Sequence, residues 1–391
     1  RFQQLIQKVG LKQPKSDISI GTKELLKKTT KLNFPILLRP SYVLGGRMME
    51  KMNSSEDVQN YIDQNYWALE NNVILIDEFL KDAKEVDVDV LRDNSGNCMI
   101  AGIMEHIEEA GVHSGDSACC IPPFSLSNEI INSIKSFSKN LANELGTVGL
   151  MNVQYAIKDN EIYILEANPR ASRTIPFLAK AIGIPFIKIA AELIAGKSLS
   201  KEFIDFEPES LPYFAIKEAV FVFNKFPNTD VILGPEMKST GEVMGIDEDF
   251  NMAYLKSQIG SGHKLYDLKN IFVSVKDEDK EDIFEIVNSL SKSGYNIYTT
   301  RGTHEFLTKK GISTNLVNKV AEGSPHVVEF IKDGKIDMVI NTTENKQAIK
   351  DSFTIRRTAV DLNVPYFTNL RSAKILYKSL ISLKNIEISV K

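Results

Sequence analysis

The spacing of apolar and polar residues divides the chain into regions of different character. From residue 1 to about 210, strands are expected to alternate with helices, and several strands carry carboxylates on one face. The clearest case is 85–90, where valines alternate with Glu85, Asp87 and Asp89. Taken alone, this alternation is typical of a half-exposed surface strand, but a sheet with one buried face and one charged cavity has the same pattern.

A regular alternation of short apolar strands and helical stretches begins at Asn270. Residues between 213 and 265, which mix proline and glycine with polar positions, are interpreted as a connecting segment and linker. The later alternation predicts a doubly wound parallel sheet of about 120 residues. We therefore expect a fold of the α/β and α+β classes, with domains at 1–212, 213–265 and 266–391. Strands of the parallel sheet are expected at 270–275, 296–300, 313–319, 337–343 and 364–369.

Composition narrows the functional classes. The 391 residues include 47 Lys and Arg against 51 Asp and Glu, a formal charge of −4, which argues against a nucleic-acid binder. No apolar run approaches the roughly 18 residues of a membrane span, and the first residues predict an amphipathic helix rather than a signal peptide. Three cysteines without CxxC spacing favour a reducing, cytoplasmic compartment. Because the chain opens with Arg1, an expressed fragment or a processed product is expected.

A candidate anion site lies between residues 34 and 50. A buried strand is expected to deliver Arg39, and Gly45 and Gly46 form a loop that Arg47 closes. Adjacent glycines let backbone N–H groups approach an anion. Arginine side chains match the geometry of phosphate oxygens. The pattern therefore indicates a phosphate-binding loop.

A candidate metal site lies on a hairpin predicted over 151–174. On its second strand Glu166, Asn168 and Arg170 alternate, so they share one face. Carboxylate and amide oxygens are ligands that Mg²⁺ prefers, and the metal would also take substrate phosphates.

The length of the hairpin turn decides whether Gln154 joins these ligands. A two-residue turn would pair Gln154 with Leu165 and place it on the other face from Glu166. A three-residue turn over 159–161 would place Gln154 directly opposite Glu166. We predict the three-residue turn.

Two further polar groupings are candidate sites. Glu108, His113 and Asp116 surround a glycine-containing turn, where both a structural and a functional role for the histidine stay open. In the doubly wound region, hydroxyls, lysines and an asparagine fall at successive strand ends, which face the ligand crevice in such folds and suit a phosphorylated small molecule. These residues are Lys280, Thr300 to Thr303, Lys319, and Asn341 to Thr343.

Several strings together resemble the large subunit of carbamoyl-phosphate synthetases. They include RPSYVLGGR, EVDVD, IMEHIEEAGVHSGDSA, GLMNVQ, EANPRASRT, NKFP, LGPEMKSTGEVMG, LVNKV and INTT, in the order that the family has. The resemblance covers essentially the whole chain and corresponds to the carboxy-terminal part of that subunit. It implies an ATP-grasp unit, a connection, and a methylglyoxal-synthase-like regulatory domain.

The resemblance implies that the ATP-grasp unit phosphorylates carbamate with ATP, the last step of glutamine-dependent carbamoyl phosphate synthesis for pyrimidine and arginine biosynthesis. Mg²⁺ or Mn²⁺ would accompany ATP, with K⁺ as a further cation. The implied ATP-binding residues are Arg39, Gly45, Gly46, Glu78, Leu80, Glu85, His113, Gln154 and Glu166. The implied metal ligands are Gln154, Glu166 and Asn168, and the implied catalytic residues are Arg170, Arg39 and Asn168.

The resemblance also implies two regulatory sites. The residues that match the site for the activator ornithine are Glu108, Asp116, Glu218 and Thr368. The residues that match the site for UMP as inhibitor and IMP as activator are Lys280, Thr300, Thr303, Lys319 and Asn341.

Some parts of the family pattern lie outside this sequence. The first nucleotide-contacting arginine of the family would precede Arg1, so it is absent here. The amino-terminal half of the large subunit, which makes carbamate, and a glutaminase small subunit are the expected partners. We therefore expect the chain to carry out partial reactions at best.

Three other functions compete with this interpretation. Another ATP-grasp ligase, such as biotin carboxylase, fits the doubly wound region and LGPEMKSTGEVMG poorly. Methylglyoxal formation by the terminal domain is disfavoured, because its first strand leads into KDEDK without an acid and a histidine. A catalytically incomplete nucleotide-binding regulatory fragment is disfavoured by the intact Glu166, Asn168 and Arg170.

Overall fold

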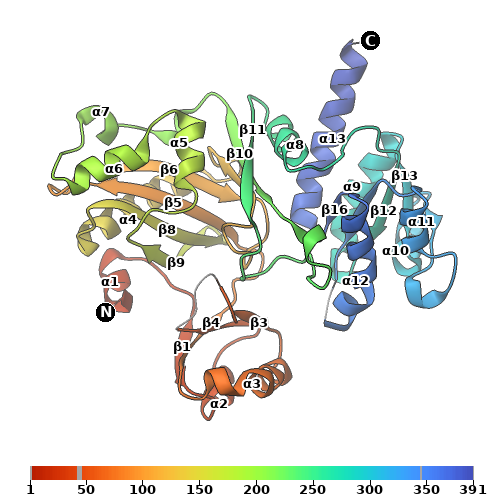
Figure 1. Ribbon diagram of the computed structural model, residues 1–391, viewed down its shortest axis with the longest axis horizontal. Helices are drawn as coiled ribbons and strands as arrows, with labels where there is room; N and C mark the ends of the chain where they lie inside the picture. Colours follow the sequence, from red (N-terminus) through yellow and green to blue (C-terminus); the bar gives the residue numbers. More distant parts are fainter. Residues whose placement is uncertain (1, 42–45, 344–345, 391) are drawn as a thin grey trace. The chain divides into compact units, whose positions relative to one another are not determined.

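A computed structural model describes residues 2–41, 46–343 and 346–390, which fall into two compact units (Figure 1). Unit 1 comprises Arg1–Pro212 and Leu233–Lys238, and unit 2 comprises Tyr213–Ile232 and Ser239–Lys391. The chain therefore leaves unit 1 after Pro212, returns to it for six residues, and then completes unit 2.

A small antiparallel sheet with the strand order β1-β4-β2-β3 forms one part of unit 1. Alternation in β2 buries Ile36 and Leu38 in a core shared with two helices, and Arg39 lies on the opposite face. Ser54 caps the longer helix by accepting a hydrogen bond from the Asp57 N–H at 3.2 Å. The elements are β1 (Ser16–Ile20), α2 (Leu25–Thr29), β2 (Ile36–Pro40), β3 (Glu50–Met52), α3 (Ser55–Leu69) and β4 (Val73–Glu78).

A larger antiparallel sheet, with the order β7-β6-β5-β8-β9 in unit 1, carries the candidate site. Its strands are β5 (Lys84–Arg92), β6 (Cys98–His106), β7 (Cys119–Ile121), β8 (Gly149–Lys158) and β9 (Glu161–Asn168). The remaining helices of unit 1 are α1 (Phe2–Val9), α4 (Asn128–Leu145), α5 (Ile175–Ile182), α6 (Phe186–Ile194), α7 (Lys201–Ile204) and the 3₁₀ turn η1 (Pro208–Ser210).

The two faces of the larger sheet differ in chemistry. Helices α1 and α4 pack on one face, where Val86, Val88 and Val90 join a continuous apolar core. The other face carries the polar residues of β5, β8 and β9. Helix α5 packs on this polar face. Its Leu178 lies so close to Gly102 of β6 that a Cβ at Gly102 would come within 2.5 Å of the leucine side chain.

The turn between β8 and β9 is shorter than predicted. Lys158 pairs with Glu161, so the turn contains only Asp159 and Asn160, whose φ angles are 52° and 62°. The three-residue turn is therefore wrong. Aspartate and asparagine tolerate the left-handed backbone that a two-residue hairpin turn requires.

A β-bulge restores the register that we predicted. Tyr155 pairs with Ile164, but the next residue, Gln154, pairs with Glu166, which leaves Leu165 as the extra residue. The bulge shifts the alternation by one position, so Glu166 does not share the core face of Ile164. The pairing of Gln154 with Glu166 is confirmed, through a bulge rather than a longer turn.

Unit 2 opens with a hairpin followed by a helix. These elements are β10 (Phe214–Val220), the 3₁₀ turn η2 (Phe223–Lys225), β11 (Gly241–Asp247) and α8 (Phe250–Gly260). Gly245 is required where the helix crosses the hairpin, because a Cβ at this position would collide with the backbone of Ala253 and Ser257.

The second part of unit 2 is a parallel sheet with the order β14-β13-β12-β15-β16, which confirms the doubly wound prediction. Phe272 and Val339 pack against α11 and α12, and the intervening Ile271 and Ile340 are also buried, so both faces are covered. The strands are β12 (Asn270–Ser274), β13 (Asn296–Thr299), β14 (Asn315–Leu316), β15 (Met338–Asn341) and β16 (Tyr366–Phe367). The helices are η3 (Asp277–Asp279), α9 (Lys280–Lys292), α10 (Arg301–Lys309), η4 (Val320–Glu322), α11 (Val327–Lys332), α12 (Lys346–Asp361) and α13 (Leu370–Val390).

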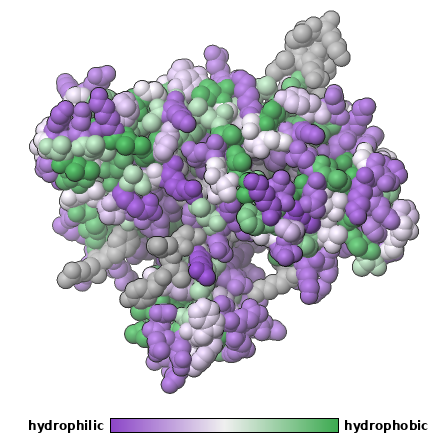
Figure 2. All heavy atoms as spheres, viewed as in Figure 1, coloured by the Kyte–Doolittle hydropathy of each residue, from purple (hydrophilic) through white to green (hydrophobic). Residues whose placement is uncertain are grey.

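In the described part of the chain, each helix is too short or too polar to cross a membrane. Hydrophilic side chains cover much of the face seen in Figure 2, with apolar side chains gathered over α6. Ile187 and Ile194 of this helix are 56% and 68% exposed, respectively. They lie seven residues apart, on one side of the helix.

Candidate functional site

Two rows of polar side chains cross three strands on the polar face of the larger sheet. One row joins Asp87, Gln154 and Glu166, and the next row joins Asp89, Asn152 and Asn168. The alternation in β5 therefore places Asp87 and Asp89 on a polar face that the rest of the protein covers at these two residues. The interpretation of 85–90 as a half-exposed surface strand is wrong, since Asp87 is 1% and Asp89 0% exposed.

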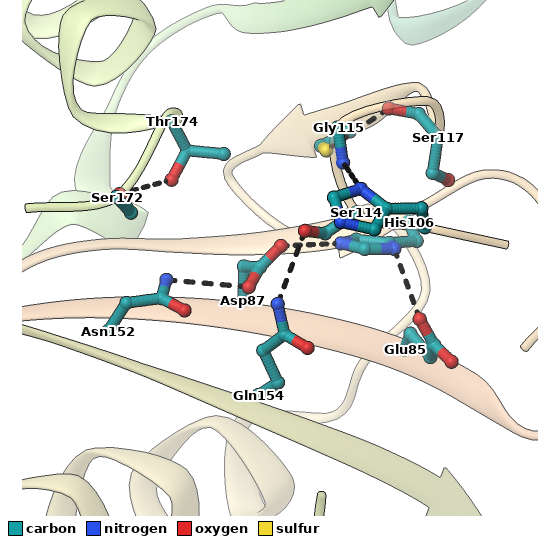
Figure 3. A network of polar contacts seen from close by, with 12 residues as sticks. Glu85, Asp87, His106, Ser114, Gly115, Ser117, Asn152, Gln154, Ser172 and Thr174 are labelled. Carbon is teal, nitrogen blue, oxygen red and sulfur yellow. Dashed lines mark hydrogen bonds and ion pairs between the residues drawn. The ribbon is translucent and has the colours of Figure 1, made fainter. Parts of the chain in front are cut away.

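Asp87 is held by a buried histidine and an amide (Figure 3). His106 Nε2 lies 2.8 Å from Asp87 Oδ2, and Asn152 Nδ2 donates to Asp87 Oδ1 at 3.4 Å. His106 Nδ1 lies 3.6 Å from Glu85 Oε2. Burial opposes a charge on His106, but Cys119 and Asp87 outweigh it and hold the pKa of His106 well above its usual value. The histidine is therefore a charged partner for the carboxylates of β5.

Asp89 has neutral partners instead. Thr174 Oγ1 donates to Asp89 Oδ2 at 2.8 Å, and Asn152 Nδ2 donates to Asp89 Oδ1 at 3.2 Å. Burial raises the pKa of Asp89 to about 6, although these hydrogen bonds act in the opposite direction. Thr174 also lies 2.7 Å from Ser172 Oγ (Figure 3), so Asp89 fixes the end of the loop that follows β9.

Gln154, Glu166 and Asn168 present oxygen atoms from neighbouring strands. Asn168 Nδ2 donates to Glu166 Oε1 at 2.7 Å, and Gln154 Nε2 donates to Ser114 Oγ at 3.2 Å (Figure 3), so both amide nitrogens have partners. The donor set, one carboxylate and two amide oxygens, fits Mg²⁺ when a nucleotide supplies phosphate oxygens. Among the described residues, no three His, Cys, Asp or Glu side chains form a metal-binding group by themselves.

His113 faces these polar rows from the loop between β6 and β7. Gly111 N–H donates to Glu85 Oε1 at 2.9 Å, and Gly115 N–H donates to His113 Nδ1 at 3.0 Å. Burial lowers the pKa of His113, and nearby carboxylates, including Glu166, offset part of this effect. Because Nδ1 accepts a hydrogen bond, the neutral ring carries its proton on Nε2 and can donate it to a ligand.

Glu108 and Asp116 hold the same loop. Glu108 Oε2 accepts hydrogen bonds from Ser117 Oγ at 2.6 Å and from Ala118 N–H at 2.7 Å. Asp116 Oδ2 accepts one from Lys238 N–H at 2.7 Å. The other two residues predicted to bind ornithine, Glu218 and Thr368, belong to unit 2, where Glu218 Oε2 accepts a hydrogen bond from Gln258 Nε2 at 2.5 Å.

The predicted phosphate-binding residues are only partly described. Arg39 Nε donates to Asp77 Oδ2 at 2.6 Å, Arg47 is exposed, and Gly45 lies outside the described residues. Gly46 has a φ of 72°, and a Cβ there would collide with the carbonyl oxygen of Pro235. Glycine is therefore required at 46 for packing as well as for conformation.

The other predicted ATP residues lie at the end of β4 and after β9. Glu78 Oε1 accepts hydrogen bonds from Asn33 N–H at 2.9 Å and Asn33 Nδ2 at 3.0 Å, so its side chain is committed within the protein. Leu80 follows in the segment that joins β4 to β5. Arg170 is exposed just after β9, with Nη1 donating to Ala171 O at 3.2 Å.

The predicted nucleotide-effector residues gather at the carboxyl ends of β12, β13 and β15. Thr300 Oγ1 lies 2.8 Å from Ser274 Oγ, and Thr303 Oγ1 accepts from Val275 N–H at 3.3 Å. Asn341 Nδ2 donates to Ser274 O at 3.1 Å, whereas its buried Oδ1 has no hydrogen-bond partner among the described residues.

Two lysines lie at this same strand end. Lys280 Nζ forms a 2.7 Å ion pair with Asp277 Oδ1. Lys280 and, more weakly, Lys319 lower the pKa of Asp277, which places both cations near this carboxylate.

Sequence reasoning left several residues of the site without a role. The sequence showed Asp87 and Asp89 only as part of an alternating pattern, and His106 only as part of a family motif. No sequence pattern indicated a role for Asn152 or Thr174. The segment Leu233–Lys238 contacts the loop of His113, although its sequence indicated a linker. Only the tertiary fold brings these residues to the polar face.

Family comparisons agree with these observations. The family described as "Carbamoyl-phosphate synthase L chain, ATP binding domain" matches residues 1–202, and "MGS-like domain" matches residues 282–368. The carbamoyl phosphate synthase large chain of Myxococcus xanthus is 48% identical over 391 residues, 100% of this chain and 36% of the relative. The C-terminal section of the large chain of Aquifex aeolicus is 45% identical over 99% of this chain and 74% of the relative.

Solved structures agree in fold. Biotin carboxylase from Campylobacter jejuni, in a β,γ-ATP complex, matches with a TM-score of 0.51 at 15% identity, over 66% of this chain and 64% of that chain. N5-carboxyaminoimidazole synthetase from Staphylococcus aureus, complexed with ADP, matches with a TM-score of 0.50 at 15% identity, over 66% and 69%. The chain spans about a third of the full-length relatives, and it belongs to the carbamoyl phosphate synthase large-chain family, of which it represents the C-terminal section.

Proposed function

We propose that unit 1 transfers a phosphoryl group between ATP and carbamate, giving ADP and carbamoyl phosphate. The observation that carries the proposal is the pair of polar rows, which place Gln154, Glu166 and Asn168 together on the polar face of the larger sheet. Arg170 follows two residues after Asn168. Phosphoryl transfer depends on positioning and charge neutralisation, which these residue types provide.

Each residue has a distinct task in this proposal. Gln154, Glu166 and Asn168 would hold Mg²⁺, which supplies charge neutralisation at the nucleotide phosphates when bound. Arg170 and Arg39 bind phosphate oxygens, and for Arg39 this requires that it release or share Asp77. The Nε2–H group of His113 donates a hydrogen bond to the nucleotide. Mn²⁺ and K⁺ stay predictions from the family resemblance.

We propose that Glu78, Leu80 and Glu85 contact the nucleoside. Glu85 already accepts a hydrogen bond from Gly111 N–H, so it is oriented before a ribose hydroxyl arrives. Glu78 and Leu80 would contribute backbone atoms to the adenine, because the Glu78 carboxylate is engaged by Asn33. Gly45 and Gly46 would cover the phosphates.

We propose further that unit 2 binds a nucleotide monophosphate, UMP or IMP, at Lys280, Thr300, Thr303, Lys319 and Asn341. The Asn341 Oδ1, which has no hydrogen-bond partner within the described parts of the chain, and the lysines near Asp277 support this role. Ornithine is the proposed ligand of Glu108, Asp116, Glu218 and Thr368. The proposed domains follow the sequence prediction, with catalysis at 1–212, a connection at 213–265, and regulation at 266–391.

The rest of the large chain and a glutaminase subunit are the proposed partners, because carbamate must come from a reaction that this chain does not hold. Relatives named as a C-terminal section support a separate amino-terminal half. The free cysteines support a location in the cytoplasm.

The test is ATP formation from ADP and carbamoyl phosphate, in which the phosphoryl group moves to ADP and carbamate leaves. We expect measurable ATP with Mg²⁺ present, and at least about a hundredfold loss in Glu166→Ala, the usual scale for a lost electrostatic contact at the reacting group. Glu161→Ala, which removes an exposed carboxylate from the same strand, is the matched control and should keep the wild-type rate. Near-normal activity of Glu166→Ala would overturn the assignment.

A further inference from the structure

Residues 223–238, here called the strap, include one of the points where the chain passes from unit 2 to unit 1. Its residues up to Ile232 belong to unit 2, and Leu233–Lys238 belong to unit 1. The strap is fixed at both ends by specific contacts, and these contacts involve elements that carry the proposed sites.

In unit 2, helix α12 holds the strap through two arginines. Arg356 is 1% exposed, its Nε donates to Asp230 Oδ1 at 2.8 Å, and its Nη2 pairs with Asp230 Oδ2. Arg357 Nη1 donates to the carbonyl oxygens of Phe223 at 2.9 Å and Phe226 at 3.2 Å. A guanidinium buried this deeply requires its partner, so the Arg356–Asp230 pair ties the strap firmly to α12.

In unit 1, the strap is bound to loops of the candidate site. His113 N–H donates to Gly234 O at 2.8 Å, and Lys238 N–H donates to Asp116 Oδ2 at 2.7 Å. Met237 contacts Arg173, three residues after Arg170, and Pro235 contacts Gly46. Displacement of this part of the strap would therefore move the loop that orients His113.

The two anchored parts are close along the chain. Only three residues separate Asp230 from Gly234, and each residue spans at most about 3.6 Å. The anchor in unit 2 and the anchor in unit 1 are therefore joined by a very short stretch of chain. Helix α12 begins at Lys346, five residues after Asn341, which ends β15 and belongs to the proposed effector site.

We propose that Arg356 and Asp230 are positioning residues for the nucleotide site of unit 1, acting through the strap. The pair holds 233–238 in the register that orients His113 and Asp116, and a ligand that moves α12 changes this register. The inference rests on the proposed nucleotide-binding function of unit 1 and adds a route for its regulation.

Hydrogen–deuterium exchange on the full chain tests the proposal without any ligand. In Arg356→Met, and in the milder Asp230→Asn, we expect faster exchange of the strap and also of the amides of His113 and Lys238 in unit 1. Exchange of the backbone amides in β5 and β12 should stay unchanged, because each strand is paired with a neighbouring strand on both sides. Lys350→Met, which removes an exposed cation from the same helix, should leave every segment at the wild-type rate.

A second arm measures the affinity for ADP with Mg²⁺ by calorimetry. We expect a loss of about fivefold in Arg356→Met and Asp230→Asn, the lower range of coupling between sites. Faster exchange at 223–230 with unchanged exchange at His113 and Lys238 would overturn the proposal, and so would unchanged affinity for ADP. If the wild-type chain does not bind ADP, the proposed function fails, whereas the exchange result still decides whether the strap positions the loop of His113.

Discussion

Individual residues on the polar face show how two buried carboxylates are tolerated in neighbouring positions. Asp87 has the charged His106 beside it, whereas Asp89 accepts hydrogen bonds from the neutral donors Thr174 and Asn152. Burial destabilises an ionised carboxylate more when no opposite charge lies nearby than when one does. This difference accounts for the raised pKa of Asp89, about 6.

The raised pKa predicts a specific pH dependence of stability for Asp89→Asn. The folded pKa is about 6 against an ordinary value of 3.8, so the folded state retains the proton longer as pH rises. Asp89 therefore lowers the free energy of unfolding of the wild type between pH 4 and 7, by about 3 kcal/mol. Asparagine does not ionise, so the variant should gain stability relative to wild type by about this amount across the same range.

Urea unfolding of both proteins at pH 4, 5, 6 and 7 measures this difference. Asp82→Asn, at a surface turn that follows β4, is the control for the loss of an exposed carboxylate. A constant difference for Asp89→Asn would show that Asp89 is ionised in the folded protein throughout this range.

Among the elements, the β8–β9 hairpin shows what sequence patterns can and cannot predict. The alternation predicted both strands and the shared face of Glu166 and Asn168 correctly. The predicted turn length was wrong, and the bulge at Leu165 could not be predicted from the sequence. Packing against the core sets the register of this strand: Ile162 and Ile164 pack into the core before the bulge, and Ala167 packs into it after the bulge.

The bulge leads to a prediction for deletion of Leu165. Leu165 is the extra residue of the bulge, so its deletion would place Glu166 directly after Ile164, still opposite Gln154 and on the polar face. We therefore expect the deletion variant to keep Mg²⁺-dependent ADP binding in calorimetry. The control, Leu165→Ala, keeps the bulge and should also keep ADP binding. Loss of ADP binding in the deletion variant alone would contradict the conclusion that the bulge serves only to pair Gln154 with Glu166.

At the scale of the whole molecule, motif strings predicted the family and the order of its parts, because long strings are specific to a family. They did not predict that Leu233–Lys238 returns to unit 1, since proline and glycine there indicated a linker. Nor did they predict the cover over the carboxylates of β5, which comes from α5 and the loop of His113. Such contacts join residues far apart in sequence, so local patterns carry no record of them.

The division into two units predicts that each proposed ligand stabilises its own unit. A ligand that binds only the folded state adds about 2.7 kcal/mol at a concentration one hundred times its dissociation constant. In scanning calorimetry of the full chain, ADP with Mg²⁺ should therefore raise the unfolding temperature of one transition, and UMP that of another. Glu166→Ala should abolish the first shift and leave the second, while Lys280→Ala should do the reverse. If Lys280→Ala abolished the ADP shift instead, nucleotide binding would belong to unit 2, and the assignment of the catalytic nucleotide to unit 1 would be wrong.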